Sequence, residues 1–347
     1  MVATAPTAVP AQGIARHRRA PDVAGDTAPL LRVSDVSVRF GGIVALDSLS
    51  FDIAPGHIVG LIGPNGAGKT TLFNCLSRLY PFTGGDIVFD GTSLKTVPRH
   101  RIAGLGIGRT FQNLALFKSL SIFDNILLGR HCHQESGFVA NALRPRSVAR
   151  EEADALARAS ELVRFLGLEA IAAEPVSAMP FGTQKRVELG RALASEPKLL
   201  LLDEPASGLN HEEVDALATL IREIRDRLQV TILLVEHHMS LVMRVSDQVV
   251  ALDFGRKIAD GTPLEVRENP EVIRAYLGTG PSAAHAAARC TRRWRTRAPS
   301  TATSSAGSGP TGSPHRARRR SRRRRSGVDP RSTQSATSIG PSASESR

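Results

Sequence analysis

Two early segments alternate between apolar and polar residues, the pattern of β-strands that bury one face. They are residues 31–40 and 46–53. Three later runs are almost entirely apolar and short, which predicts fully buried strands. They are residues 57–62, 198–202 and 230–235. Shorter strands are expected at 86–90, closed by Gly91, and at 249–252 and 257–259, which would form a hairpin around Phe254-Gly255.

Between these strands, apolar residues recur at helical spacing. A helix is expected after Thr71, and Gly84-Gly85 are expected to end that region. Its apolar face would be Leu72, Phe73, Leu76 and Leu79. The block from about 113 to 180 is expected to be mostly helical, with one face formed by Leu156, Ala159, Leu162, Val163 and Leu166 before Gly167. Strands that alternate with helices predict an α/β fold with a mainly parallel sheet, into which this helical block is inserted.

The charge of the chain is concentrated at its C-terminal end. Residues 281–347 contain 15 Arg and 2 acidic residues, a net charge of +13, so residues 1–280 carry −1 of the total of +12. The Ser/Arg-rich tail (281–347) and the Ala/Pro/Thr-rich start (1–28) have too few aliphatic residues to fold, so both are expected to be disordered, with one folded domain at 29–280.

Other classes of protein are excluded by composition. The three cysteines have no paired spacing, which argues against a disulfide framework or a metal site. No run approaches the roughly 18 apolar residues of a membrane span. The N-terminus lacks the apolar centre of a signal peptide, so the expected compartment is the cytoplasm.

Residues 63–70 match the phosphate-loop motif, also called Walker A, at every fixed position, between a predicted strand and a predicted helix. Its glycines let successive backbone N–H groups point at phosphate oxygens, and the helix N-terminus adds a positive dipole end. Lys69 is expected to reach the β- and γ-phosphates, and Thr70 to ligate Mg²⁺. The expected nucleotide contacts are Gly63, Pro64, Asn65, Gly66, Ala67, Gly68, Lys69, Thr70 and Thr71.

A second motif, typical of Walker B, consists of two acidic residues that follow the apolar run at 199–202. Asp203 is expected to hold Mg²⁺, and Glu204 to act as the general base that polarises the attacking water. The alternative for Glu204 is a solvated or capping role.

Together with these two motifs, further segments resemble the ATP-binding subunits of ABC transporters, in the same order, over residues 31 to 278. Arg109-Thr-Phe-Gln112 resembles the glutamine loop, and Met179–Gln184 stands where the signature motif stands. Ala206–Asn210 is similar to the D-loop, and Val235–Met239 contains the switch histidine, His237. The resemblance implies an α/β, P-loop ABC-type domain with an antiparallel N-terminal β part and an inserted helical subdomain.

The family binds ATP between two subunits, which implies roles for residues outside the phosphate loop. Gln112 would contact Mg²⁺ and the attacking water, and His237 the γ-phosphate. Gly182 and Thr183 would meet the γ-phosphate of the opposite subunit, and Phe40 would stack on adenine. Each has a plainer alternative: a structural histidine, a core phenylalanine, a surface glutamine.

Two departures from the family pattern stand out. Met179, Pro180 and Phe181 replace the usual start of the signature, and proline offers neither a hydroxyl nor an N–H. His238 replaces the usual aspartate after the switch histidine. A subfamily with such variants resembles this chain, so the site is interpreted as a functional variant.

That subfamily is the ATPases of branched-chain amino acid importers. The resemblance is carried by residues 41–46, 109–113, 117–125 and, above all, 269–278. It implies an ATP- and Mg²⁺-dependent ATPase, bound peripherally at the cytoplasmic face of the membrane. Its partners would be two permease subunits, an identical or homologous second ATPase and, indirectly, a solute-binding protein.

Alternatives remain at this stage. They are the ATPase of a related system (import of other amino acids, amides or urea, or lipopolysaccharide export), and a soluble, non-transport ABC ATPase. The arginine runs at 318–320 and 322–325 could give the tail weak affinity for anionic lipid or nucleic acid. The alternatives are that the tail has no function, and that it derives from a reading-frame slip or a recent extension.

Overall fold

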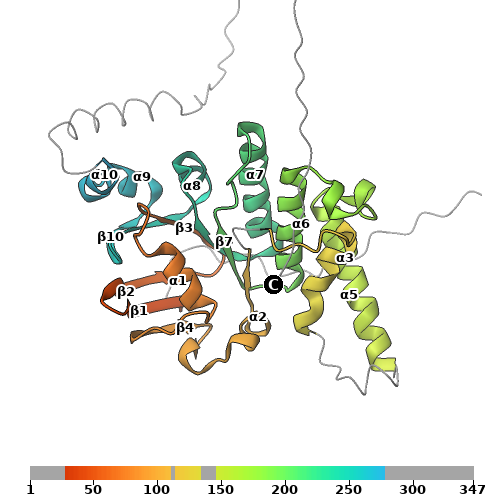
Figure 1. Cartoon of the computed structure of the whole chain (residues 1–347), viewed down its shortest axis with the longest axis horizontal. Coiled ribbons are helices and arrows are strands. Elements are labelled where there is room, and N and C mark those ends of the chain that lie inside the picture. Colours follow the sequence, from red (N-terminus) through yellow and green to blue (C-terminus); the bar gives the residue numbers. More distant parts are fainter. Residues whose placement is uncertain (1–27, 111–113, 134–145, 278–347) are drawn as a thin grey trace, which may run out of the picture. The chain divides into compact units, whose positions relative to one another are not determined.

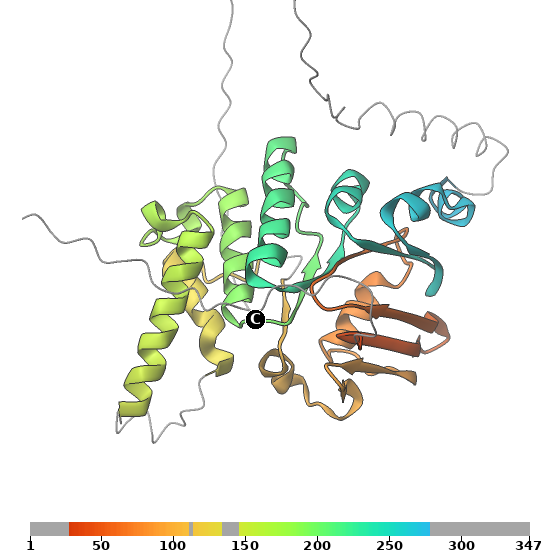
Figure 2. The same cartoon turned by 180° about the vertical axis from the view of Figure 1, so that it is seen from behind.

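A computed structural model describes residues 28–110, 114–133 and 146–277 of the 347-residue chain (Figures 1 and 2). The expected disordered segments (1–28 and 281–347) therefore lie outside the described residues, except for position 28. Gln112 and the arginine runs of the tail lie outside them as well. In the described residues, no helix is long and apolar enough to cross a membrane.

The first sheet is antiparallel and has the strand order β2-β1-β4-β5. Its strands are β1 (Leu31–Phe40), β2 (Ile43–Ile53), β4 (Gly84–Phe89) and β5 (Thr92–Ser93). The alternation in the sequence is realised in β1, where Leu31, Val33, Val36 and Val38 are buried. The predicted antiparallel N-terminal β part is thus confirmed.

The second sheet has the order β10-β9-β3-β8-β7-β6. Its strands are β3 (Ile58–Ile62), β6 (Ile107–Arg109), β7 (Leu199–Asp203), β8 (Thr231–Val235), β9 (Gln248–Asp253) and β10 (Arg256–Gly261). All pairs are parallel except the expected hairpin of β9 and β10. Strands β3, β7 and β8 are buried along their whole length, as their apolar runs predicted.

Helices and single turns connect the strands. The α-helices are α1 (Lys69–Leu76), α2 (Ile102–Leu105), α3 (Ile122–Leu127), α5 (Arg146–Phe165), α6 (Phe181–Ala194), α7 (His211–Leu228), α8 (Met239–Val245), α9 (Pro263–Glu268) and α10 (Pro270–Leu277). The 3-10 turns are Leu94–Thr96, Arg99–Arg101, Leu128–His133, Glu169–Ile171 and Val176–Ala178. The described part of 113–180 is mainly helical, as expected.

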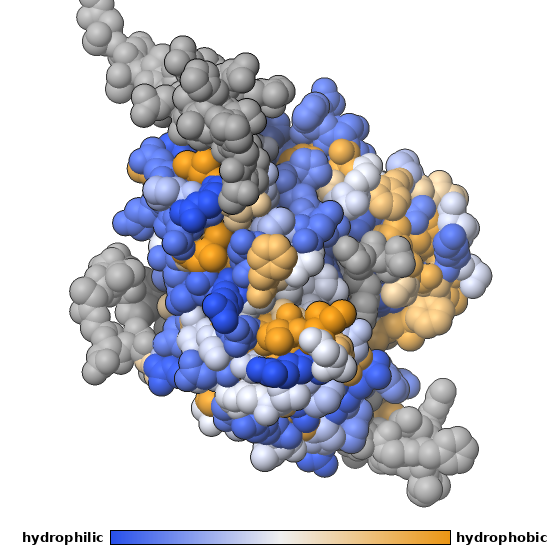
Figure 3. Space-filling view, turned by 60° about the vertical axis from the view of Figure 1, so that its left-hand side comes forward, coloured by the Kyte–Doolittle hydropathy of each residue, from blue (hydrophilic) through white to orange (hydrophobic). Residues whose placement is uncertain are grey.

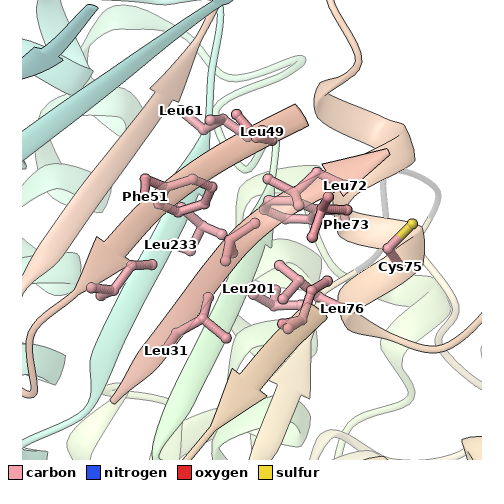
Figure 4. Close-up of a cluster of buried hydrophobic side chains, with 14 of the residues drawn as sticks. Leu31, Leu49, Phe51, Leu61, Leu72, Phe73, Cys75, Leu76, Leu201 and Leu233 are labelled. Carbon is pink, nitrogen blue, oxygen red and sulfur yellow. The ribbon is translucent and has the colours of Figure 1, made fainter. Parts of the chain in front are cut away.

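Two hydrophobic clusters cover opposite faces of the parallel sheet. Leu201 and Leu233 point to the face covered by the antiparallel sheet and α1, with Leu31, Phe51 and Phe73 (Figure 4). Their neighbours Leu200, Leu202, Ile232 and Leu234 point to the other face, which α6, α7 and the inserted helices cover (Figures 1 and 2). Because side chains alternate along a strand, β7 and β8 each contribute to both layers.

Several details of the sequence prediction were wrong. Gly84 and Gly85 begin β4 instead of ending a helical region, since Gly85 (φ +71°) lies against the backbone of Ser34 and Asp35, where no side chain fits. Helix α1 ends at Leu76, so Leu79 is not part of it. Strand β2 begins at Ile43 instead of Leu46. Leu156 is 47% exposed, although the other four predicted positions of its helix face are buried.

Some apolar side chains remain exposed at the surface. They are Phe40, Ile43, Val44, Tyr80, Phe117, Leu128, Leu156, Phe181, Phe254, Leu264 and Tyr276. Figure 3 shows one face, on which apolar surface (orange) interrupts a mostly polar one (blue).

Candidate nucleotide-binding and hydrolysis site

The polar segments of the site follow three neighbouring strands of the parallel sheet. Leu61 of β3 lies opposite Val235 of β8, which in turn lies opposite Asp203 of β7. The carboxyl ends of parallel strands share one edge of a sheet, which is the usual place for ligands in open α/β folds. The phosphate loop, Glu204 and His237 therefore meet at this edge.

The phosphate loop needs glycine where its backbone turns tightly. Gly68, just before α1, has φ +99°, and a Cβ there would lie 2.7 Å from the carbonyl oxygen of Ala45. Gly66 also has a positive φ, +84°. Among the described residues, no side chain caps the N-terminus of α1, so its first N–H groups are left for another acceptor. This geometry suits a phosphate group.

The side chain of Lys69 folds back over this loop. Its Nζ donates to the carbonyl oxygens of Gly63 (2.7 Å) and Pro64 (3.0 Å), and the residue is only 6% exposed. Burial lowers the pKa of Lys69, and the negative charges of Glu204 and Asp203 oppose that shift. The loop thus holds one cationic donor beside the acids of the site, while Thr70 is exposed at the start of α1.

Asp203 ends β7 and is almost completely buried. Arg109 of β6 donates to its Oδ2 at 2.9 Å, whereas Oδ1 is buried without a hydrogen-bond partner in the described part of the chain. Burial raises the pKa of Asp203, and the hydrogen bond from Arg109 opposes the shift. An unpaired carboxylate oxygen at the strand end fits a hard divalent cation such as Mg²⁺.

Arg109 also ties this carboxylate to the helix that follows the phosphate loop. Its Nη1 donates to Asn74 Oδ1 at 2.9 Å and to Ser77 Oγ at 3.1 Å. This ion pair was not predictable from the sequence, where Arg109 is part of a family motif and nothing local relates it to Asp203.

Glu204 and His237 are in direct contact. His237 Nε2 lies 2.7 Å from Glu204 Oε1, across the ends of β7 and β8. Glu204 has a left-handed backbone (φ +49°), and its N–H donates to the carbonyl oxygen of Val235 at 2.9 Å. Non-glycine residues in this conformation are uncommon and cluster at functional sites. A carboxylate held by an imidazole in this way can accept a proton from water.

Within the described residues, the predicted aromatic and signature residues form no hydrogen bond with Glu204 or His237. Phe40 ends β1, is 43% exposed, and packs edge-on against Tyr80 with ring centres 5.1 Å apart, so it is not a core residue. Gly182 and Thr183 lie in the first turn of α6, whose N-cap is Pro180. In the described residues, no hydrogen bond joins them to the phosphate loop of the same chain.

Helix α10 makes a contact with the phosphate loop that the sequence did not predict. The Gly63 N–H donates to the hydroxyl oxygen of Tyr276 at 2.7 Å. Although Tyr276 is 41% exposed as a residue, partial desolvation of its hydroxyl raises the pKa to about 12, so the hydroxyl is neutral at physiological pH. Helix α10 thereby supports the first residue of the loop.

Replacing Tyr276 by Phe should lower the free energy of unfolding by about 1 kcal/mol, because the Gly63 N–H loses its acceptor. Urea unfolding of the full chain measures the effect. Tyr80→Phe, which alters the chain's other tyrosine, is the control and should change stability less. Equal stability of Tyr276→Phe and the unaltered chain would contradict the supporting role of this contact.

Known proteins similar to this chain are ATP-binding proteins of transporters, in agreement with a nucleotide-binding site at this edge of the sheet. The family described as ABC transporter matches residues 46–207, and the family described as branched-chain amino acid ATP-binding cassette transporter matches residues 256–281. BraF of Pseudomonas aeruginosa, a high-affinity branched-chain amino acid transport ATP-binding protein, is 42% identical over 250 residues, which are 72% of this chain and 98% of BraF. LivG of Escherichia coli K12, which has the same description, shows the same identity and coverage.

Solved structures agree as well. The ATP-binding cassette MJ1267 of an ABC transporter, in its ADP conformation, superposes with a TM-score of 0.64 at 27% identity, over 73% of this chain and 100% of that chain. CbiO1 of Clostridium perfringens, part of the ABC transporter complex cbiONQ, gives 0.61 at 29% identity, over 74% and 98% of the two chains.

The fold, the site and these relatives define an ATP-binding cassette. This chain belongs to the ATP-binding subunits of ABC transporters, and it is an ATPase.

Proposed function

We propose that this chain hydrolyses ATP to drive the import of branched-chain amino acids. The observation that carries the hydrolysis is the contact of Glu204 with His237 beside the phosphate loop. The cargo is inferred from two similarities: BraF and LivG are transport ATP-binding proteins for these amino acids, and residues 256–281 match the corresponding family. This second match favours the importer over the other ABC systems.

In this proposal, the phosphate loop and Lys69 bind the β- and γ-phosphates, and Phe40 stacks on adenine. Thr70, Asp203 and Gln112 would hold Mg²⁺, which when bound neutralises phosphate charge. Glu204 accepts a proton from the attacking water, and His237 keeps Glu204 oriented and contacts the γ-phosphate. Desolvated donors at this edge stabilise the negative charge of the transition state.

A second ATPase subunit would complete the site. Gly182 and Thr183 begin α6, a 14-residue helix, so their N–H groups face an acceptor from outside the helix. In a two-subunit sandwich that acceptor is the γ-phosphate of the partner's nucleotide. Pro180 supplies no donor, and the backbone of Gly182 and Thr183 takes over this role.

The further partners are two permease subunits and, indirectly, a solute-binding protein. The chain would then work at the cytoplasmic face of the membrane as a peripheral subunit. Uptake of labelled leucine by cells tests this proposal: deletion of the gene should abolish high-affinity uptake, and the intact gene should restore it. Unchanged uptake of leucine, isoleucine and valine in the deletion strain would contradict the proposed cargo.

The tail is proposed to be dispensable for hydrolysis. Every proposed site residue precedes position 238, and residues 281–347 contain 15 Arg among mainly small and polar residues. Deletion of 281–347 should leave the ATPase rate within about twofold, and should remove affinity for anionic vesicles, which salt weakens by screening. Vesicle sedimentation and ATPase assays at low and physiological salt measure both effects. Loss of ATPase activity on truncation would contradict this prediction.

A further inference from the structure

Glu236 is a buried carboxylate between the switch histidine and the D-loop. It follows β8 directly and is only 1% exposed. Its Oε1 accepts a hydrogen bond from the Ala206 N–H at 2.6 Å. Its Oε2 accepts from the N–H groups of His237 (3.0 Å) and His238 (3.3 Å), and the Nδ1 atom of His238 lies 3.3 Å from the same oxygen.

The burial of the Glu236 carboxylate has to be offset by other interactions. Transfer of a carboxylate out of water is costly unless charged or hydrogen-bonding partners replace the water. Within the described residues, the ion-pair partners of Glu236 include no lysine or arginine; His238 is the one basic side chain beside it. Backbone N–H groups therefore stabilise the carboxylate, and its contacts fix the positions of these backbone segments.

These contacts lie next to the proposed hydrolytic pair. The segment 204–206 is joined to the segment 235–238 at two points: the Glu204 N–H donates to the carbonyl oxygen of Val235, and the Ala206 N–H to Glu236. Between these two points, the side chains of Glu204 and His237 touch at 2.7 Å. Displacement of either segment would open the contact of Glu204 with His237.

We propose that Glu236 is a positioning residue for ATP hydrolysis, which locks the backbone of the switch histidine to the D-loop. It acts through His237, so this inference rests on the proposed role of His237. Glu236 reaches neither the phosphate loop nor Asp203 among its hydrogen bonds, and nucleotide binding should not depend on it.

The lock requires a carboxylate and not only a side chain of the same shape. Both oxygens face backbone donors, Ala206 on one side and His237 with His238 on the other. The amide NH₂ of a glutamine would face one of these sets of backbone N–H donors, and two donors cannot form a hydrogen bond with each other. A buried backbone N–H would then lack an acceptor. Glu236→Gln should therefore break one half of the lock with almost no change in volume.

A double-mutant cycle on the full chain tests the inference. Glu236→Gln should lower kcat by about tenfold or more, with KM for ATP within about twofold, because only the hydrolytic geometry is lost. In the His237→Ala background, Glu236→Gln should lower kcat by less than about twofold further, since the group it positions is already absent. Glu236→Asp keeps the charge and should recover part of kcat.

Asp247→Asn is the control for the loss of one carboxylate, at a residue that is exposed and also pairs with Arg225 at 2.9 Å. Asp247 also accepts from a backbone N–H, that of Ile58 at 2.8 Å, but at the opposite end of β3. Asp247→Asn should leave kcat near that of the unaltered chain. Equal losses of kcat from Glu236→Gln in the unaltered chain and in the His237→Ala chain would overturn the inference. An unchanged kcat of Glu236→Gln would overturn it as well. So would misfolding of both Glu236 variants, measured by urea unfolding. An unchanged kcat for His237→Ala would contradict the proposed role of His237 itself, and with it this inference.

Discussion

Glu204→Gln should lower the ATPase rate by about 10²–10⁴-fold and leave ATP binding intact. The amide keeps the shape of the side chain but cannot accept a proton from water. Lys69 and the phosphate loop are unaffected, so ATP should still bind, and the unhydrolysed nucleotide should hold two subunits together. Steady-state hydrolysis, direct titration with ATP and size-exclusion chromatography with ATP measure these three effects.

The control for this variant is Glu223→Gln. Glu223 lies on α7, where it pairs with Arg227 at 3.9 Å at the surface. It should leave hydrolysis unchanged, since an exposed ion pair contributes little. Hydrolysis by Glu204→Gln at the rate of the unaltered chain would show that Glu204 is not the general base.

Lys69→Ala should weaken ATP binding by roughly 10- to 100-fold and stop hydrolysis, because a charged hydrogen-bond donor to the phosphates is lost. The ammonium group of Lys69 is buried against the loop at 2.7 Å from the Gly63 carbonyl oxygen, so few other groups can take its place. Isothermal titration with ATP and an ATPase assay measure the two losses.

Lys95→Ala is the control for the loss of one positive charge. Lys95 is exposed, and its Nζ lies 5.7 Å from the centre of the Phe82 ring. It should bind and hydrolyse ATP normally. An affinity of Lys69→Ala for ATP equal to that of Lys95→Ala would contradict the assigned contact with the phosphates.

The strands and the phosphate loop were predictable because their signals are local. The apolar runs that became β3, β7 and β8 need burial on both faces, which only the middle of a covered sheet provides. The loop motif is contiguous and is preceded by a strand and followed by a helix. Asp203 and Glu204 were proposed because they directly follow a predicted strand, whereas His237 was proposed only from its match to the family's switch histidine.

The missed interactions join residues that are distant in the sequence. Tyr276 and Gly63 are 213 positions apart, and Arg109 and Asp203 are 94 apart. Only the packing of α10 and β6 beside the site brings them together. Glu236 gave no signal because a single acid after a strand is common, and its burial depends on where the D-loop folds back.

The wrong predictions for Gly84-Gly85 and for Leu156 have local causes. Gly84-Gly85 has the composition of a turn, but the pairing of β4 with β1 extends the strand through both glycines. Leu156 has the spacing of its buried neighbours, yet it lies at the edge of the buried face of α5.

ATP-driven uptake by the reconstituted transporter tests the central claim most directly. The chain, its permeases and its partner ATPase are placed in liposomes loaded with ATP, with the solute-binding protein and labelled leucine outside. Leucine should accumulate with the unaltered chain and fail to accumulate with Glu204→Gln. Hydrolysis of ATP without uptake of leucine, isoleucine or valine, or equal uptake with Glu204→Gln, would contradict the account.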